Sequence, residues 1–270
     1  MSSIKKNIKI ATILPYKENY TFAKASAASL WVSEFYKKSK LNKTNHIYGH
    51  TKSKDYLTKN YFNIELSNIK SKFRSATREY INKLTKRFRH QKYDLIEIHN
   101  RPVILEELTK KIKSRYIMYF HNDPLSMNGS KTINQRLNII SNVEKIIFVS
   151  EWVQKRFFVD LDDKLKTKTE VVYPSVTTKK KLSKKKNFIT FIGKLNRSKG
   201  YDLFAKVIVK ILDEFPMWEA YSLGDEERRN IYIKHKNHHE LGFLKHKDVL
   251  ELLDKTSISV VPSRWEEPFG

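Results

Sequence analysis

Short apolar runs alternate with amphipathic stretches along most of the chain, and this alternation limits the possible folds more than any other feature. Ile8, Ile10, Ile13 and Leu14 form the first run, and in residues 22–36 apolar side chains then recur at intervals of three and four. Continuous apolar runs are typical of strands buried on both faces, and the three-to-four spacing is typical of helices that bury one face. The sequence therefore predicts a layered α/β protein with mainly parallel sheets.

The same pattern occurs twice, which predicts two domains. Further strands are expected at 95–98, 116–120 and 146–149 in the first part, and at 188–192, 218–223 and 258–261 in the second, with helices at 203–215 and 249–253. Between the two parts, six lysines fall within residues 179–186, as in a solvated linker. We predict an N-terminal Rossmann-like domain at 1–175, a lysine-rich linker at 176–187 and a partial C-terminal domain at 188–270.

Charge and cysteine content exclude several classes of protein. The chain has 53 Lys and Arg against 29 Asp and Glu, a formal net charge of +24, and it has no cysteine. A disulfide scaffold, thiolate catalysis and cysteine metal sites are therefore excluded. The first residues lead directly into a strand without a secretory apolar region, and we expect a soluble cytoplasmic protein. The excess of lysine fits either an anionic partner or a general lysine bias on solvated surfaces.

The segment after the strand at 188–192 has the composition of a site for an anion. Gly193 and Gly200 enclose a loop that contains Lys194 and Lys199, and a long amphipathic helix follows. Free backbone amides at a helix N-terminus and the helix dipole favour a phosphate or diphosphate there. A basic solvated loop is the alternative interpretation.

A second candidate segment follows the strand at 258–261. Residues 262–270 contain Glu266 and Glu267, and we expect them at the same sheet edge as Lys194 and Lys199. Carboxylates accept hydrogen bonds from sugar hydroxyls, so cations and a carboxylate at one edge suit a nucleotide sugar. The alternative is an exposed acidic turn held by Pro268.

In order and spacing, these segments resemble the retaining glycosyltransferases of family 4, which have the GT-B fold. The segments that carry the resemblance are 191–195, 199–200, 222–225 and 262–270, preceded by 93–100, 119–122, 148–151 and 172–174. The resemblance implies two Rossmann-like doubly wound domains that face each other across a cleft, with the second domain incomplete. We expect a chain that is C-terminally truncated, because the family's second glutamate would fall at position 275.

The resemblance also implies an activity. It implies transfer of a sugar from a nucleotide diphosphate sugar to a glycan or glycolipid acceptor, with retained configuration and without a cofactor or an essential metal. Polysaccharide or lipopolysaccharide synthesis is the family-level expectation. Lys194, where the family has Arg, and Lys199 would stabilise the departing diphosphate, and Glu267 would hold the donor sugar. The predicted donor-binding residues are Gly193, Lys194, Lys199, Gly224, Glu267, Pro268, Phe269 and Gly270.

On the acceptor side, the family's histidine corresponds to His121, directly after the strand at 116–120. The resemblance places its imidazole opposite the donor sugar, where it would bond a hydroxyl or help to order the reacting face. His99 and Asn100, at the end of the strand at 95–98, join it in the predicted acceptor side. A histidine that packs over the strand end is the alternative.

Residues 71–90 predict a basic amphipathic helix, with apolar residues at helical spacing and Lys and Arg around them. It would either contact an anionic membrane that carries a lipid-linked acceptor, or pack on the sheet with its charges in solvent. Two other patterns have simpler interpretations. Asp160 and Asp162 resemble a metal clamp but follow an amphipathic stretch, and His235, His238 and His239 are assigned to a polar surface loop without metal.

Two alternative functions remain open at this point. One is a GT-B nucleotide-sugar epimerase, which product analysis without acceptor would identify. The other is a basic module that binds lipid or nucleic acid without catalysis, for which salt-sensitive binding would be diagnostic. No base-reading motif accompanies the charge, so we expect no nucleic-acid partner.

Overall fold

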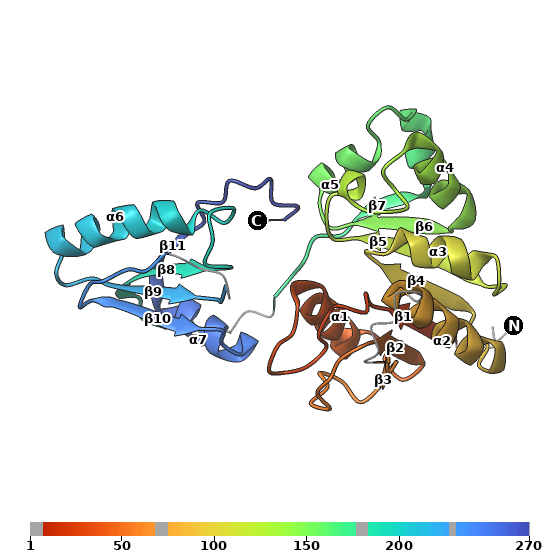
Figure 1. Ribbon diagram of the computed structural model, residues 1–270, viewed down its shortest axis with the longest axis horizontal. Helices are drawn as coiled ribbons and strands as arrows, with labels where there is room; N and C mark the ends of the chain where they lie inside the picture. The colour runs from red at the N-terminus through yellow and green to blue at the C-terminus, as the bar shows by residue number, and fades with distance from the viewer. Residues whose placement is uncertain (1–7, 68–74, 177–182, 227–230, 270) are drawn as a thin grey trace, which may run out of the picture. The chain divides into compact units, whose positions relative to one another are not determined.

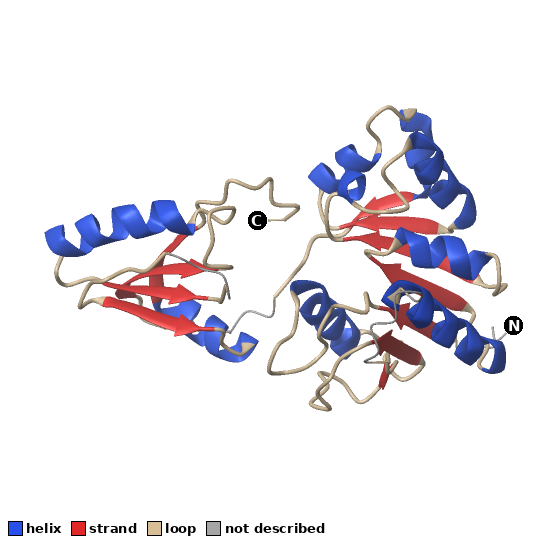
Figure 2. Cartoon of the chain, in the orientation of Figure 1, coloured by secondary structure: helices blue, strands red, loops and turns tan. Residues whose placement is uncertain are grey.

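The computed structural model describes residues 8–67, 75–176, 183–226 and 231–269. The chain divides into two compact units, one of residues up to Val176 with Phe269, the other from Thr177 to Pro268. Figure 1 shows helices and strands in both units, and Figure 2 distinguishes them by colour. Within the described ranges, no helix has the length and apolar character needed to cross a membrane.

The first unit is built on a seven-stranded sheet whose strands are all parallel, in the order β3-β2-β1-β4-β5-β6-β7. The strands are β1 Ile10–Ile13, β2 Asn45–Gly49, β3 Tyr61–Asn63, β4 Leu95–His99, β5 Arg115–Phe120, β6 Lys145–Phe148 and β7 Thr169–Val171. The helices are α1 Ala27–Lys38, α2 Ala76–His90, α3 Pro102–Thr109, α4 Ile133–Asn142 and α5 Glu151–Phe157, with 3-10 turns η1 Pro124–Ser126 and η2 Asp163–Lys168.

The two faces of this sheet differ in chemistry. Side chains at alternate positions, such as Ile96 and Ile98 on β4, pack with α2, α3 and α4 into the larger apolar core. The positions between them, Glu97 and His99, point to the opposite face, where Tyr36 and Trp31 of α1 lie over them. The face under α1 is therefore the one that holds buried polar groups at the carboxyl ends of the strands.

The second unit has a four-stranded parallel sheet in the order β10-β9-β8-β11. Its elements are β8 Lys186–Ile192, α6 Tyr201–Glu214, β9 Glu219–Leu223, β10 His238–Gly242, α7 His246–Lys255 and β11 Thr256–Val260. The buried face of α6 packs Phe204, Ile208 and Leu212 against Ile189 and Phe191 of β8. Because β8 and β11 are parallel neighbours, the loops that follow them leave the sheet at the same edge.

Side-chain caps account for the starts of several helices. Ser26 begins α1 by accepting a hydrogen bond from the amide of Ser29. At α4, the Thr132 hydroxyl accepts from the amide of Gln135, and the Gln135 side chain accepts from the amide of Thr132. Polar caps next to apolar periodicity are why these segments begin as helices where they do.

The alternating pattern predicted the α/β class, and the strands expected at 95–98, 116–120 and 146–149 are confirmed as β4, β5 and β6. The polar loop predicted around the three histidines is wrong, because His238 and His239 lie on strand β10. His238 accepts or donates a 2.9 Å hydrogen bond with the Ser222 hydroxyl on β9, which fixes this polar edge strand.

The predicted linker also differs from the structure in its extent. Residues 177–182 lie outside the described residues, and β8 begins at Lys186, within the lysine run. Ser183 is hydrogen-bonded to α7, since its hydroxyl donates to Asp254 at 2.5 Å. The last residues of the run therefore belong to the second unit instead of a free connection.

Candidate functional site

The loop after β8 approaches the end of β9 so closely that only glycine fits. Gly193 donates its amide to Leu223, and a β-carbon on Gly224 would lie 1.9 Å from the carbonyl oxygen of Gly193. Gly224 also has φ +133°, a conformation that side chains other than glycine rarely adopt. The main chains of Gly193 and Gly224 thus pack directly against each other at the carboxyl ends of β8 and β9, and we call this contact the glycine floor.

Lys199 and Glu267 meet at this edge. The Lys199 ammonium lies 2.5 Å from Oε1 of Glu267, and both side chains are partly exposed. The Ser263 hydroxyl donates to the same carboxylate oxygen at 2.8 Å, and the Trp265 ring lies 5.5 Å from the ammonium. The structure therefore brings together the cation and the carboxylate that the sequence placed in separate segments.

The two loops are joined through their main chains. Gly200 has φ +74°, and a β-carbon there would lie 2.0 Å from the carbonyl oxygen of Pro262. The carbonyl of Ser198 accepts hydrogen bonds from the amides of both Arg264 and Trp265, at 2.9 and 3.2 Å. This contact fixes the segment that contains Glu267 against the beginning of α6.

Lys194 and the last predicted residues lie differently. The Lys194 side chain is exposed, without a hydrogen bond or ion pair among the described residues, so the structure does not bring it to Glu267. Pro268 is buried and Phe269 is exposed. Gly270 lies outside the described residues.

Asp202 and Arg264 form an ion pair that the sequence interpretation missed. Asp202 lies in the first turn of α6, and the Arg264 guanidinium donates to its two carboxylate oxygens at 2.5 and 3.0 Å. The guanidinium holds the pKa of this carboxyl below its usual value. The helix N-terminus predicted to attract an anion therefore already carries a carboxylate, and only the adjacency of the two loops reveals the pair.

In the first unit, His99 and His121 form a hydrogen-bonded pair at the ends of β4 and β5. Nδ1 of His99 lies 2.8 Å from Nε2 of His121. His99 is buried, and the amide of His121 donates to the side-chain oxygen of Asn100, which has φ +51°. Burial lowers the pKa of His99 well below its usual value and that of His121 to about 4. Both imidazoles are therefore neutral at pH 7.

Aromatic rings enclose this pair. The His99 ring stacks on Tyr119 with centroids 4.4 Å apart, and Trp31 from α1 makes a T-shaped contact with His121, with centroids 5.3 Å apart. These contacts hold both imidazole planes. The predicted acceptor-side residues His99, Asn100 and His121 thus lie together at one strand edge.

A buried carboxyl next to the histidines was not expected from the sequence. Glu97 is 6% exposed and is bonded by the hydroxyls of Thr12, Tyr36 and Tyr119. Burial raises its pKa. The alternation on β4 places Glu97 and His99 on one face, and this was the only sign in the sequence of a buried carboxyl. Whether that face is buried depends on the position of α1, which the sequence does not give.

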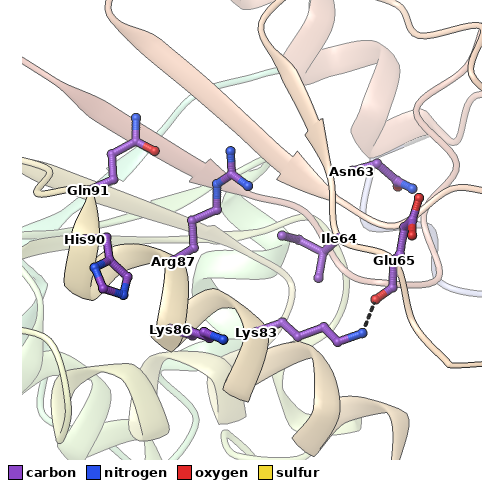
Figure 3. Close-up of a pocket in the computed structure, with 8 residues that line it drawn as sticks. All are labelled: Asn63, Ile64, Glu65, Lys83, Lys86, Arg87, His90 and Gln91. Atoms are coloured by element: carbon purple, nitrogen blue, oxygen red, sulfur yellow. Dashed lines mark hydrogen bonds between the residues drawn. The ribbon is translucent and has the colours of Figure 1, made fainter.

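The predicted basic helix is α2, which begins at Ala76 with Ser75 as its cap; residues 71–74 of the predicted range lie outside the described residues. Its apolar stripe is buried in the core of the first unit, so the packed alternative holds for that face. The opposite face borders an open pocket of about 630 Å³. The pocket is lined by Asn63, Ile64, Glu65, Lys83, Lys86, Arg87, His90 and Gln91 (Figure 3).

The charges of this pocket are only partly compensated. Lys83 bonds to the carbonyl of Glu65 at 2.6 Å, drawn in Figure 3, and pairs with the Glu79 carboxylate at 2.9 Å. Arg87 lies over the rings of Tyr48 and Phe62 without a carboxylate partner among the described residues. The pocket therefore presents cations to solvent.

Neither the Asp160–Asp162 segment nor the three histidines at 235–239 form a metal-binding arrangement in the described residues. No group of three His, Asp or Glu side chains there is arranged to hold an ion. Asp162 caps η2 through the amide of Lys164. His235 lies 3.4 Å from Asp213, and His239 lies 3.2 Å from Glu219.

Comparison with known proteins shows which proteins this chain is similar to. Residues 175–270 match the family described as glycosyl transferases group 1. The fold is similar to that of Anabaena Alr3699/HepE in complex with UDP-glucose, with a TM-score of 0.69 at 14% identity, over 97% of this chain and 76% of that one. It is also similar to sucrose-phosphate synthase from Thermosynechococcus elongatus, with a TM-score of 0.64 at 14% identity, over 97% and 77%. The chain has the GT-B fold.

Two curated relatives come from Bacillus subtilis (strain 168). Spore coat protein SA is 23% identical over 215 residues, which are 66% of this chain and 56% of that protein. Putative glycosyltransferase YtcC is 24% identical over 225 residues, or 71% and 54%. The chain spans about half the length of these relatives. The predicted resemblance to glycosyltransferases with the GT-B fold is thereby confirmed.

Proposed function

We propose that the protein of which this chain is part transfers a sugar from a nucleotide diphosphate sugar to a hydroxyl of a glycan or glycolipid. The observation that carries the proposal is the pairing of Lys199 with Glu267 at the glycine floor of the second unit. A solved structure of similar fold is described in complex with UDP-glucose, which fits the same class of donor.

Each group at this edge has a chemical use toward such a donor. The diphosphate would take the Lys199 ammonium as its counter-ion, and the ammonium would offset the negative charge that develops as the sugar departs. Glu267, released from Lys199, would accept hydrogen bonds from sugar hydroxyls. The close contact of Gly193 with Gly224 fixes the main chain from which the loop that contains Lys199 leaves the sheet.

The reaction proposed is retaining and needs no bound metal. The acceptor oxygen bonds to the anomeric carbon on the face from which the diphosphate oxygen leaves, and the hydroxyl proton passes to that departing oxygen. Lys199 supplies the positive charge that a metal ion supplies in other transferases. On the acceptor side, His121 offers a neutral imidazole to a hydroxyl.

Substitution of Lys199 tests this proposal. Lys199→Ala should weaken binding of UDP- or GDP-sugars to the full-length protein by ten-fold or more, because it removes a partly desolvated cation from the diphosphate. Lys206→Ala, at an exposed lysine on the helix α6 that follows Lys199, is the matched control and should bind like the wild type. Calorimetry with a panel of nucleotide sugars measures both.

Equal affinities of the Lys199 and Lys206 variants, or no binding of any nucleotide sugar by the full-length protein, would refute the proposal. Binding with turnover in the absence of any acceptor would instead indicate an epimerase. Salt-sensitive binding to lipid or nucleic acid in place of nucleotide sugar would indicate a non-catalytic module.

A second proposal concerns the membrane. Lys86 and Arg87 line the pocket beside α2 and have no carboxylate partner in the described part of the chain, which favours an anionic lipid surface as the place where the enzyme binds its acceptor. The contact is electrostatic, because the apolar stripe of α2 packs into the core and has no surface to insert.

A further inference from the structure

The hydrogen bond between His99 and His121 restricts which nitrogen of His121 carries the proton. One proton lies between Nδ1 of His99 and Nε2 of His121, which are 2.8 Å apart. Burial keeps both rings neutral, and a neutral imidazole has one N–H and one bare nitrogen. Two arrangements are therefore possible: either His99 donates through Nδ1, or His121 donates through Nε2.

The second nitrogen of His99 distinguishes the two arrangements. Nε2 of His99 is buried and has no hydrogen-bond partner. If His121 donated, the His99 proton would lie on this enclosed nitrogen as a donor without an acceptor. If His99 donates, Nε2 is instead an acceptor without a donor, and buried unpaired acceptors are tolerated more often than buried unpaired N–H groups.

We infer that His99 is a positioning residue: its Nδ1–H donates to Nε2 of His121 and thereby fixes the His121 proton on Nδ1. Nδ1 of His121 has no hydrogen-bond partner among the described residues and, unlike Nε2 of His99, is not one of the fully enclosed unpaired atoms there. His121 therefore presents a fixed N–H donor at the end of β5. The ligand group that it takes is an oxygen acceptor, such as a sugar hydroxyl or a phosphate oxygen.

The surroundings support a fixed geometry. Stacking on Tyr119 holds the His99 plane, and the Tyr119 hydroxyl bonds to Glu97, which is itself bound by Thr12 and Tyr36. The edge of Trp31 and the oxygen of Asn100 hold His121 on its other sides. In this arrangement His121 is a donor toward the ligand and does not act as a base through either nitrogen, since Nε2 is occupied and Nδ1 is protonated.

Imidazole NMR tests the inference without any ligand. In the ¹⁵N-labelled protein at pH 7, long-range ¹H–¹⁵N spectra should show Nδ1 of His121 protonated and Nε2 as an acceptor, with the signals assigned by their loss in His121→Phe. The wild-type spectrum alone decides: a proton on Nε2 of His121 overturns the inference.

Two variants of His99 separate the hydrogen bond from the packing. Asn places an amide nitrogen where Nδ1 was, so His99→Asn should keep the His121 tautomer although it loses the stack. His99→Phe keeps the stack and loses the donor, and the Nε2–H form of His121 should then appear. The same tautomer change in both variants would show that packing, not the hydrogen bond, sets the proton.

A catalytic consequence rests on the proposed function. In the full-length protein, His99→Phe should lower kcat/KM for the acceptor about 3- to 10-fold relative to His99→Asn, as expected for one neutral hydrogen bond. Nucleotide-sugar affinity should be the same in both variants. Failure of the Lys199 test would remove the proposed transfer reaction and leave the tautomer result standing, so the two ideas fail separately.

Discussion

Gly200 illustrates at the scale of one residue how the two candidate loops depend on each other. Its left-handed backbone begins α6, and the absent side chain makes room for the carbonyl of Pro262. Gly242 has a similar φ of +63°, but a β-carbon there would meet nothing within 4 Å. Comparison of the two positions therefore distinguishes the effect of backbone strain from the effect of a steric collision.

Alanine at these positions should have unequal effects. Both substitutions incur the strain of a left-handed alanine, on the order of 1 kcal/mol. Gly200→Ala adds the collision with Pro262, and we expect it to lower the free energy of unfolding by at least about 2 kcal/mol more than Gly242→Ala. Urea denaturation of the two variants measures the difference, and equal losses would mean that the Pro262 loop is not held against Gly200.

At the scale of elements, the ends of β4 and β5 should make stability sensitive to acid. The pKa of His121 is lowered to about 4 in the folded chain from 6.5 in the unfolded one. Between these values the unfolded chain binds more protons, so the contribution of this residue is complete above pH 6.5 and is lost as the pH falls toward 4.

Comparison with His121→Phe isolates this contribution. Between pH 6.5 and 4 the wild type should lose on the order of 2 kcal/mol more stability than the variant. Denaturation at a series of pH values gives the two curves, and the carboxylates that titrate in the same range cancel in their difference. Parallel curves would indicate that His121 is accessible to protons in the folded chain.

The elements also show what the sequence was able to predict. Strands such as β5 and β6 are continuous apolar runs, and this pattern of hydrophobic residues was enough to predict them. Strands β2 and β10 were missed because their sequences, NHIYG and HHELG, are polar; partners on neighbouring strands, such as Ser222 for His238, stabilise them.

The candidate site divides in the same way. Strand order and a glycine-lysine loop were enough to expect Lys199 and Glu267 at one sheet edge. The pairs Asp202–Arg264 and His99–His121 depend on which side chains meet across different loops or strands, and no local pattern encodes that distance. Prediction of the buried Glu97 also required the position of α1, because Tyr36 on that helix donates one of the hydrogen bonds to Glu97.

At the scale of the whole molecule, the net charge of +24 raises the question of whether the proposed lipid binding depends on the residues beside α2 or on overall charge. The double variant Lys86→Glu/Arg87→Glu should bind vesicles that contain anionic lipid at least ten-fold more weakly, because each basic group near such a surface contributes about 1 kcal/mol. Vesicle sedimentation at low and high salt measures the change, and salt should weaken the wild type.

Lys206→Glu/Lys210→Glu on α6 makes the same change in net charge elsewhere and serves as the control. It should retain most of the binding. An equal loss in both double variants would assign binding to overall charge, and no loss in either would remove the membrane proposal.

The shared carbonyl of Ser198 has a consequence for how the donor side responds to a ligand. Two amides of the loop after Pro262 donate to one carbonyl oxygen in the loop before α6. The position of each loop therefore depends on the position of the other. Whatever pulls on Lys199 is transmitted through the main chain to the neighbourhood of Glu267. For the proposed nucleotide-sugar donor, recognition of the phosphates and recognition of the sugar would therefore be coupled through this contact.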